Sequence, residues 1–106
     1  LIFNSVGHMR KIDLSSYSYK GEEIPTKDLL SQVLSAGTHT PADLFKRLKL
    51  IEQVEKADGV LYLEEADYTI VSRAVETLGA AFILPHAEFL MRVLQAPQVD
   101  VQEKIT

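Results

Sequence analysis

Apolar side chains recur at three- and four-residue steps in four parts of the chain, a spacing typical of helices that bury one face. The pattern predicts helices over residues 26 to 36, 41 to 56, 64 to 78 and 84 to 95. Local signals mark their expected ends. They are capping hydroxyls at Thr26 and Thr40, stops at Gly37 and Gly79, and Pro97 after the last helix. The expected apolar face of the second helix consists of Leu44, Phe45, Leu48, Ile51 and Val54.

Two further segments favour strands. Residues 11 to 14, Lys-Ile-Asp-Leu, alternate polar and apolar side chains, and residues 60 to 63 are a run of β-formers too short for a helix. We expect the second segment to pair with the extended stretch near residues 10 to 19, which ends in a turn at Lys20-Gly21-Glu22. The predicted fold is mainly α with a minor α+β part, a compact four-helix domain with a short two-stranded β-pairing.

A length of 106 residues fits one domain. We expect this helical domain to span residues 9 to 97. Residues 1 to 8 precede Met9 and contain the Gly-His that many cloning vectors leave, so they are interpreted as a vector remnant or a disordered arm. Residues 98 to 106 have weak periodicity and are expected to be a frayed tail.

Charge and cysteine content narrow the possible functions. The net charge is −4, and residues 54 to 106 carry nine acidic and four basic side chains, so binding to a phosphate backbone is not expected as the main function. The chain has no cysteine, which excludes thiolate chemistry and fits a cytoplasmic setting. No uncharged stretch, Thr77 to Ala87 included, reaches the roughly 20 residues that span a bilayer, so no membrane partner is expected.

The last predicted helix is apolar around most of its circumference, so it should be covered on more than one side. This surplus of apolar surface predicts contact with another protein, either a second copy of the chain or a larger partner. The candidate interface residues are Phe82, Ile83, Phe89, Leu90, Met91, Val93 and Leu94.

Two alternatives rest on charge. Lys46, Arg47 and Lys49 follow a Thr-Pro helix start, and a helix-turn-helix regulator could place them in a DNA groove. An inhibitor of a host protein could instead imitate nucleic acid with its acidic side chains, which are Glu64, Glu65, Asp67 and Glu76.

No pattern predicts catalysis, a cofactor or a metal site, so the chain is not expected to be an enzyme. Asp58-Gly59 with Glu65 matches the second half of an EF-hand loop, but Val54 and Lys56 occupy its first and third ligand positions. We therefore interpret this region as a helix–turn–strand–helix shape without calcium. The histidines are too scattered for metal-ligand spacing, and the serines have no nucleophile context.

The order of elements resembles that of a loose group of small phage-encoded proteins. The likeness covers residues 9 to 94. It includes the start at Met9 to Leu14, the turn at Lys20-Gly21 and the helix at Leu29 to Leu34, followed by the turn, strand and acidic helix start at Ala57 to Glu65. The resemblance implies a viral accessory or assembly setting, in a host cytoplasm, and assigns no role to any residue.

Overall fold

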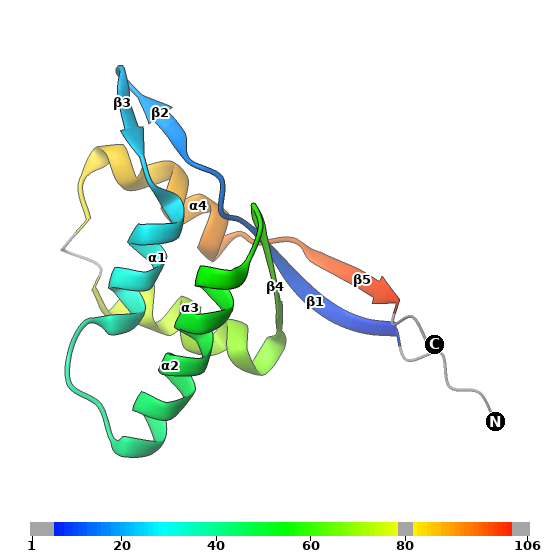
Figure 1. Ribbon diagram of the computed structural model, residues 1–106. Coiled ribbons are helices and arrows are strands. Elements are labelled where there is room, and N and C mark those ends of the chain that lie inside the picture. The colour runs from blue at the N-terminus through cyan, green and yellow to red at the C-terminus, as the bar shows by residue number, and fades with distance from the viewer. Residues whose placement is uncertain (1–5, 79–81, 103–106) are drawn as a thin grey trace.

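The computed structural model describes residues 6 to 78 and 82 to 102. These residues form four α-helices, one short 3₁₀ helix and five strands in two sheets (Figure 1). The expectation of a mainly α domain with a minor β-pairing is therefore wrong, and the fold is α+β. The error arose at residues 6 to 8 and 98 to 102, which form strands, and at residues 17 to 24, which form a separate hairpin.

The larger sheet is centred on β1 (Val6–Asp13), which lies between β4 (Val60–Glu64) and β5 (Gln98–Gln102). Both pairings are antiparallel, and Met9 lies opposite Glu64 on one side and Val99 on the other. The predicted pairing of residues 60 to 63 with the segment after residue 10 is thus confirmed.

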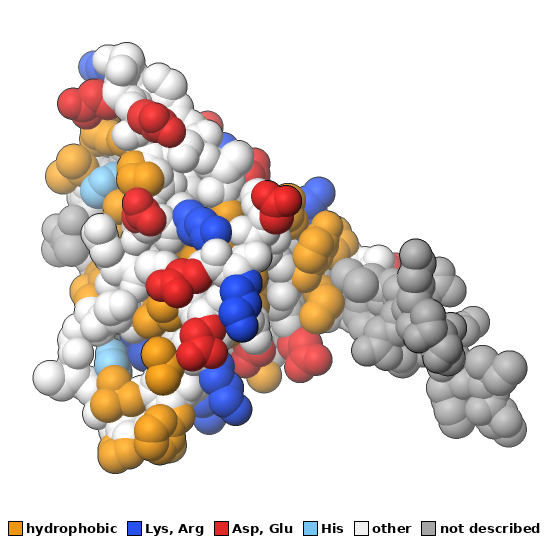
Figure 2. Space-filling model, in the orientation of Figure 1, with side chains coloured by type: hydrophobic (Ala, Val, Ile, Leu, Met, Phe, Trp, Pro, Cys, Tyr) orange, Lys and Arg blue, Asp and Glu red, His pale blue; other side chains and the backbone are white. Residues whose placement is uncertain are grey.

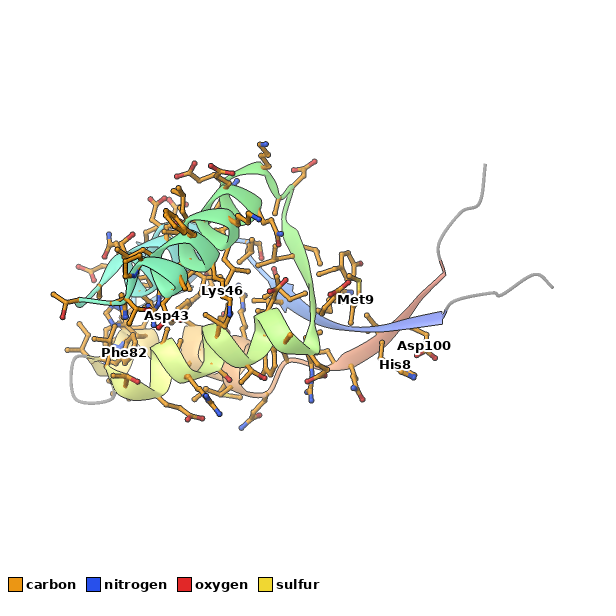
Figure 3. The ribbon with its side chains drawn as sticks, turned by 90° about the horizontal axis from the view of Figure 1, so that it is seen from below. His8, Met9, Asp43, Lys46, Phe82 and Asp100 are labelled. Atoms are coloured by element: carbon orange, nitrogen blue, oxygen red, sulfur yellow. The ribbon has the colours of Figure 1, made fainter. Side chains whose placement is uncertain are left out.

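Both expected loose ends of the chain contribute to this sheet. Residues 6 to 8 belong to β1 and residues 98 to 102 form β5, so the expectations of an arm and a frayed tail are wrong there, while residues 1 to 5 and 103 to 106 lie outside the described part. Beyond the end of β4, β1 and β5 continue as a two-stranded ribbon that extends away from the helices (Figure 1). His8 and Asp100 face each other across it, with Nδ1 and Oδ1 2.8 Å apart (Figure 3).

The smaller sheet is a hairpin of β2 (Tyr17–Tyr19) and β3 (Glu22–Ile24). Lys20 and Gly21 join the strands with φ of 48° and 85°, the left-handed values that a tight hairpin turn requires at both positions. The predicted turn is confirmed.

The helices lie close to their predicted bounds. They are α1 (Thr26–Ser35), α2 (Pro41–Lys56), α3 (Glu65–Thr77) and α4 (Ala87–Leu94), and the 3₁₀ helix η2 (Leu84–His86) leads into α4. Thr40 caps α2 as expected, since its side chain accepts a hydrogen bond from the Asp43 N–H at 3.4 Å. Thr26 does not cap α1, because its hydroxyl is buried and donates to the Ser15 carbonyl at 2.9 Å. The expected stop at Gly79 lies outside the described residues.

The core lies between the larger sheet and the helices, with α3 at its centre in contact with β1, β4, α1 and α4. The α2 helix packs chiefly against α1. The largest fully buried side chains are Ile12, Leu30, Leu34, Leu50, Val54, Leu63, Val71, Val75, Phe89 and Val93.

Candidate interaction site

The structure divides the predicted α4 interface into an inner and an outer half. Phe89 and Val93, four residues apart, are fully buried in the core, and Phe82 and Leu90 are half-buried against it. The expectation that Phe89 and Val93 are interface residues is therefore wrong, because they face the chain's own core. The predicted interface residues that remain exposed to solvent are Ile83, Met91 and Leu94.

Leu84, which the sequence analysis did not select, completes the exposed half. The α4 face is defined here as Ile83, Leu84, Met91 and Leu94, whose side chains are between 40% and 71% exposed. Leu84, Met91 and Leu94 lie seven and three residues apart, so they share one side of η2 and α4. The signal that could have found Leu84 is this same spacing, continued back across Pro85.

Two tyrosines from other elements fix the α4 helix. Tyr17 on β2 donates a hydrogen bond to the Pro85 carbonyl at 2.7 Å and accepts one from the Phe89 N–H at 3.2 Å. Tyr68 on α3 donates to the Val93 carbonyl at 2.6 Å. Burial raises the pKa of the Tyr68 phenol above its usual range, so it remains a donor at neutral pH. Tyr17 and Tyr68 therefore hold the two ends of α4.

Two charged side chains on α4 pair with each other beside the α4 face. Arg92 donates to the Glu88 carboxylate at 2.9 Å and to the Ser15 carbonyl at 2.6 Å, and its guanidinium lies 5.0 Å from the centre of the Tyr17 ring. Ser15 donates two hydrogen bonds to Asp13 beside them, which lowers the pKa of that carboxyl. Glu88, three residues before Met91, therefore borders the α4 face with its carboxylate paired to Arg92.

A second exposed apolar surface lies at the start of α2. The α2 face is defined here as Leu44, Phe45 and Leu48, whose side chains are between 49% and 67% exposed. In Figure 2, hydrophobic side chains gather at the lower edge of the molecule over the start of α2. These residues were predicted to be the buried face, but the side of α2 that packs on the core carries Leu50 and Val54.

The three cations proposed for DNA binding have different surroundings. Arg47 donates to the Leu34 carbonyl at 3.1 Å, which ties α2 to the end of α1. Lys46 and Lys49 line a groove of about 370 Å³ between α2 and α3, where Lys46 points toward α3 (Figure 3). The Asp67 carboxylate also lines this groove and Arg47 is held by Leu34, so this geometry does not favour the DNA-binding alternative.

The acidic residues proposed for an inhibitor are also divided. Glu65 accepts hydrogen bonds from Arg10 at 2.6 Å and from Gln98 at 3.0 Å, and the Arg10 contact lowers the pKa of its carboxyl. It therefore joins α3 to β1 and β5. Glu64 precedes it as the last residue of β4 and is exposed.

The region that resembles an EF-hand forms the predicted helix–turn–strand–helix, with α2, a turn at Gly59, β4 and α3 in order. In residues 6 to 78 and 82 to 102, no three potential metal-ligating side chains gather at one point. His39 contacts the Ala36 carbonyl through Nε2 at 2.8 Å, and the His86 ring packs edge-on against Phe82. Both histidines therefore have structural contacts.

Comparison with protein-family models, curated proteins and solved structures finds no match for this chain. The resemblance to small phage-encoded proteins accordingly stays a prediction. Within the part of the chain that the structure describes, none of the helices has the length and apolar character needed to cross a bilayer.

Proposed function

We propose that this chain is a non-enzymatic assembly module that binds a second copy of itself through the α4 face. The observation that carries the proposal is the exposure of four large apolar side chains close together in the chain, Ile83 and Leu84 at the start of η2 and Met91 and Leu94 on α4. Spacings of three and seven residues are those with which helices pack against one another. Glu88 borders this stripe, and its carboxylate pairs with Arg92 of the same helix at 2.9 Å, so a contact across a two-fold axis need not bring unpaired like charges together.

The energetic argument depends on the water-exposed area of these side chains. Full burial of one such side chain is worth about 1.5–3 kcal/mol, and the four on the α4 face together expose slightly more than two side chains' worth of surface. Two copies would double the gain, and association entropy would offset much of it. The net association is therefore expected to be weak, and a dissociation constant on the order of micromolar to millimolar is the range to test.

Sedimentation velocity of the whole chain tests the proposal. We expect the mean mass to rise above that of a monomer as concentration rises from about 10 µM to about 1 mM. Met91→Glu should raise the dissociation constant by at least about tenfold, because each interface would then bury two unpaired carboxylates.

Gln53→Glu is the matched control, since it adds the same charge at an exposed position on another helix. It should sediment like the unmodified chain. A chain that stays monomeric at every concentration, or a Met91→Glu variant that associates as well as the control, would refute self-assembly through the α4 face.

A further inference from the structure

The β4 strand lies at one edge of the larger sheet, so β1 uses only one side of its backbone. The hydrogen-bond pattern tells which residues face the other side. The Leu14 N–H donates to the Gly59 carbonyl at 2.8 Å, and this pair continues the register of β1 with β4. Hydrogen-bonded and non-hydrogen-bonded pairs alternate along an antiparallel ladder, so every second residue of β4, counted from Gly59, bonds to β1.

Val60 and Tyr62 therefore direct their N–H and C=O groups away from β1. No described residue forms a hydrogen bond with these groups. The open backbone side of Val60 and Tyr62 is called the β4 edge here. Natural edge strands discourage a further strand with charges, prolines or bulges, and residues 60 to 63 have none of these features. The β4 edge can therefore pair with one more strand.

A groove of about 530 Å³ lies beside the β4 edge. The end of α2 and the start of α3 contribute to its walls, together with Tyr62, which is 46% exposed, and Met9, which lies next to β4 in Figure 3. Ligand pockets typically have volumes of about 300–1,000 Å³. A single extended chain fits such a groove, whereas β4 of a second copy would bring its own flanking helix ends into it.

The groove carries opposite charges near the two ends of β4. Lys56 ends α2 four residues before β4, and Asp67 lies in the first turn of α3, three residues after β4. Glu64, the last residue of β4, adds a second carboxylate at the Asp67 end. None of the three forms an ion pair with another described residue. A strand that runs opposite to β4 would begin beside the carboxylates and end beside Lys56.

We propose that the β4 edge binds an extended peptide of another protein as an additional antiparallel strand. The peptide carries a basic side chain near its amino end and an acidic side chain near its carboxyl end, which complement the charges of the groove. Its backbone exchanges two hydrogen bonds with Val60 and two with Tyr62, as in other cases of strand addition to a sheet edge. The contact does not depend on the α4 face, because no residue of that face lines the groove.

The probe is a capped six-residue peptide that begins with lysine, ends with glutamate and alternates valine and threonine between them. NMR titration of the whole chain should give a dissociation constant between about 10 µM and about 1 mM. Absence of binding up to about 3 mM overturns the proposal. The control peptide, with lysine and glutamate exchanged, should bind at least about threefold more weakly, and equal binding overturns the antiparallel arrangement.

Methylated peptides test whether the backbone carries the contact. One version has N-methyl groups on both valines, and the other has them on both threonines. Alternate residues of a strand direct their N–H groups to opposite sides, so only one of the two versions keeps the donors that face β4. The affinities of the two versions should differ by at least about tenfold. Equal affinities overturn the strand pairing.

Amide hydrogen exchange locates the bound peptide. Exchange should slow at Val60 and Tyr62, and it should change less at Leu61 and Leu63, which already bond to β1. Equal slowing at all four residues overturns the proposal, because it indicates a general stabilisation of the chain. Slowing at Val60 and Tyr62 that rises with protein concentration in the absence of peptide also overturns it, because a second copy then occupies the edge.

Tyr62→Pro removes the central donor at a position where an edge strand tolerates proline. This variant should bind the peptide at least about tenfold more weakly than its control Tyr62→Val, which keeps the N–H group. Equal binding overturns the proposal. Circular dichroism checks folding, and the methylated peptides decide the matter if Tyr62→Pro unfolds. Met91→Glu should bind the peptide as the unmodified chain does, so failure of self-association through the α4 face leaves this inference standing.

Discussion

Tyr17 is predicted to control the rigidity of the α4 face from a different element. Its hydroxyl donates to the Pro85 carbonyl in η2 and accepts from the Phe89 N–H in the first turn of α4. His86, at the N-cap position, makes no side-chain capping bond, so Tyr17 supplies the cap from β2. Tyr17→Phe removes both hydrogen bonds and keeps the ring that packs beneath Arg92.

The magnitude follows from the two bonds. A typical intramolecular hydrogen bond contributes about 0.5–1.5 kcal/mol net, and both of these lie in a part-buried region that water can partly reach. We expect Tyr17→Phe to lower the free energy of unfolding by about 1–2 kcal/mol, which lowers Tm by about 4–8 °C per kcal/mol for a domain of this size.

Urea denaturation measures the global effect, and amide hydrogen exchange locates it. Exchange should accelerate over residues 84 to 94 more than elsewhere, because the first turn of α4 would lose its external partner. Tyr19→Phe is the matched control, since Tyr19 lies on the same strand and its hydroxyl has no hydrogen bond to another described residue. The reasoning is refuted if the two variants unfold at the same urea concentration, or if exchange over residues 84 to 94 is unchanged.

Three further predictions concern packing, pH and backbone conformation. Phe89→Ala should lower the free energy of unfolding by about 3–5 kcal/mol in urea titration, because Phe89 is fully buried, whereas truncation of exposed Met91 to Ala should change it by less than about 1 kcal/mol. The Ser15 hydrogen bonds lower the pKa of the Asp13 carboxyl below its usual value of 3.8. The ionised carboxylate therefore stabilises the fold above about pH 4, and this contribution is lost as the pH falls through the folded pKa. Asp13→Asn should therefore reduce the loss of stability on acidification below about pH 4, measured by urea titration at each pH. Gly59→Ala should lower the free energy of unfolding by about 1–2 kcal/mol in thermal or urea titration, because φ is +79° there. No neighbouring atom would clash with the new methyl group, so the cost comes from the backbone conformation alone.

Local sequence signals were sufficient for the helices and for one strand pair. The Thr40-Pro41 start of α2 and the run at residues 60 to 63 depend on interactions within a few residues, and both predictions are confirmed. β5 could not be found in this way, because its partner β1 lies about ninety residues earlier in the chain. The alternation at residues 98 to 102 was present in the sequence, but its stability comes from an edge of β1 that only the folded sheet provides.

The sequence showed how much of α2 and α4 is apolar, but not which side of each helix is buried. The α4 segment is apolar around most of its circumference, so its sequence could not tell which side is buried. The structure turns Phe89 inward and Met91 outward. In α2, Leu44 and Leu48 share one stripe and Leu50 and Val54 share another, and both satisfy helical spacing. Burial follows the second stripe because only the later part of α2 reaches the core.

Both uncovered faces can be traced to how the chain uses its strands. The first part of β1 and most of β5 form a ribbon that extends away from the helices, so this β-structure covers no helix surface (Figure 1). The α3 helix occupies the centre of the remaining sheet and core, which leaves α2 packed chiefly on α1 and α4 covered on one side. The surface that the ribbon does not cover is left exposed on α2 and α4. Because burial of each large apolar side chain is worth about 1.5–3 kcal/mol, this exposed surface is what our proposal of association through the α4 face depends on.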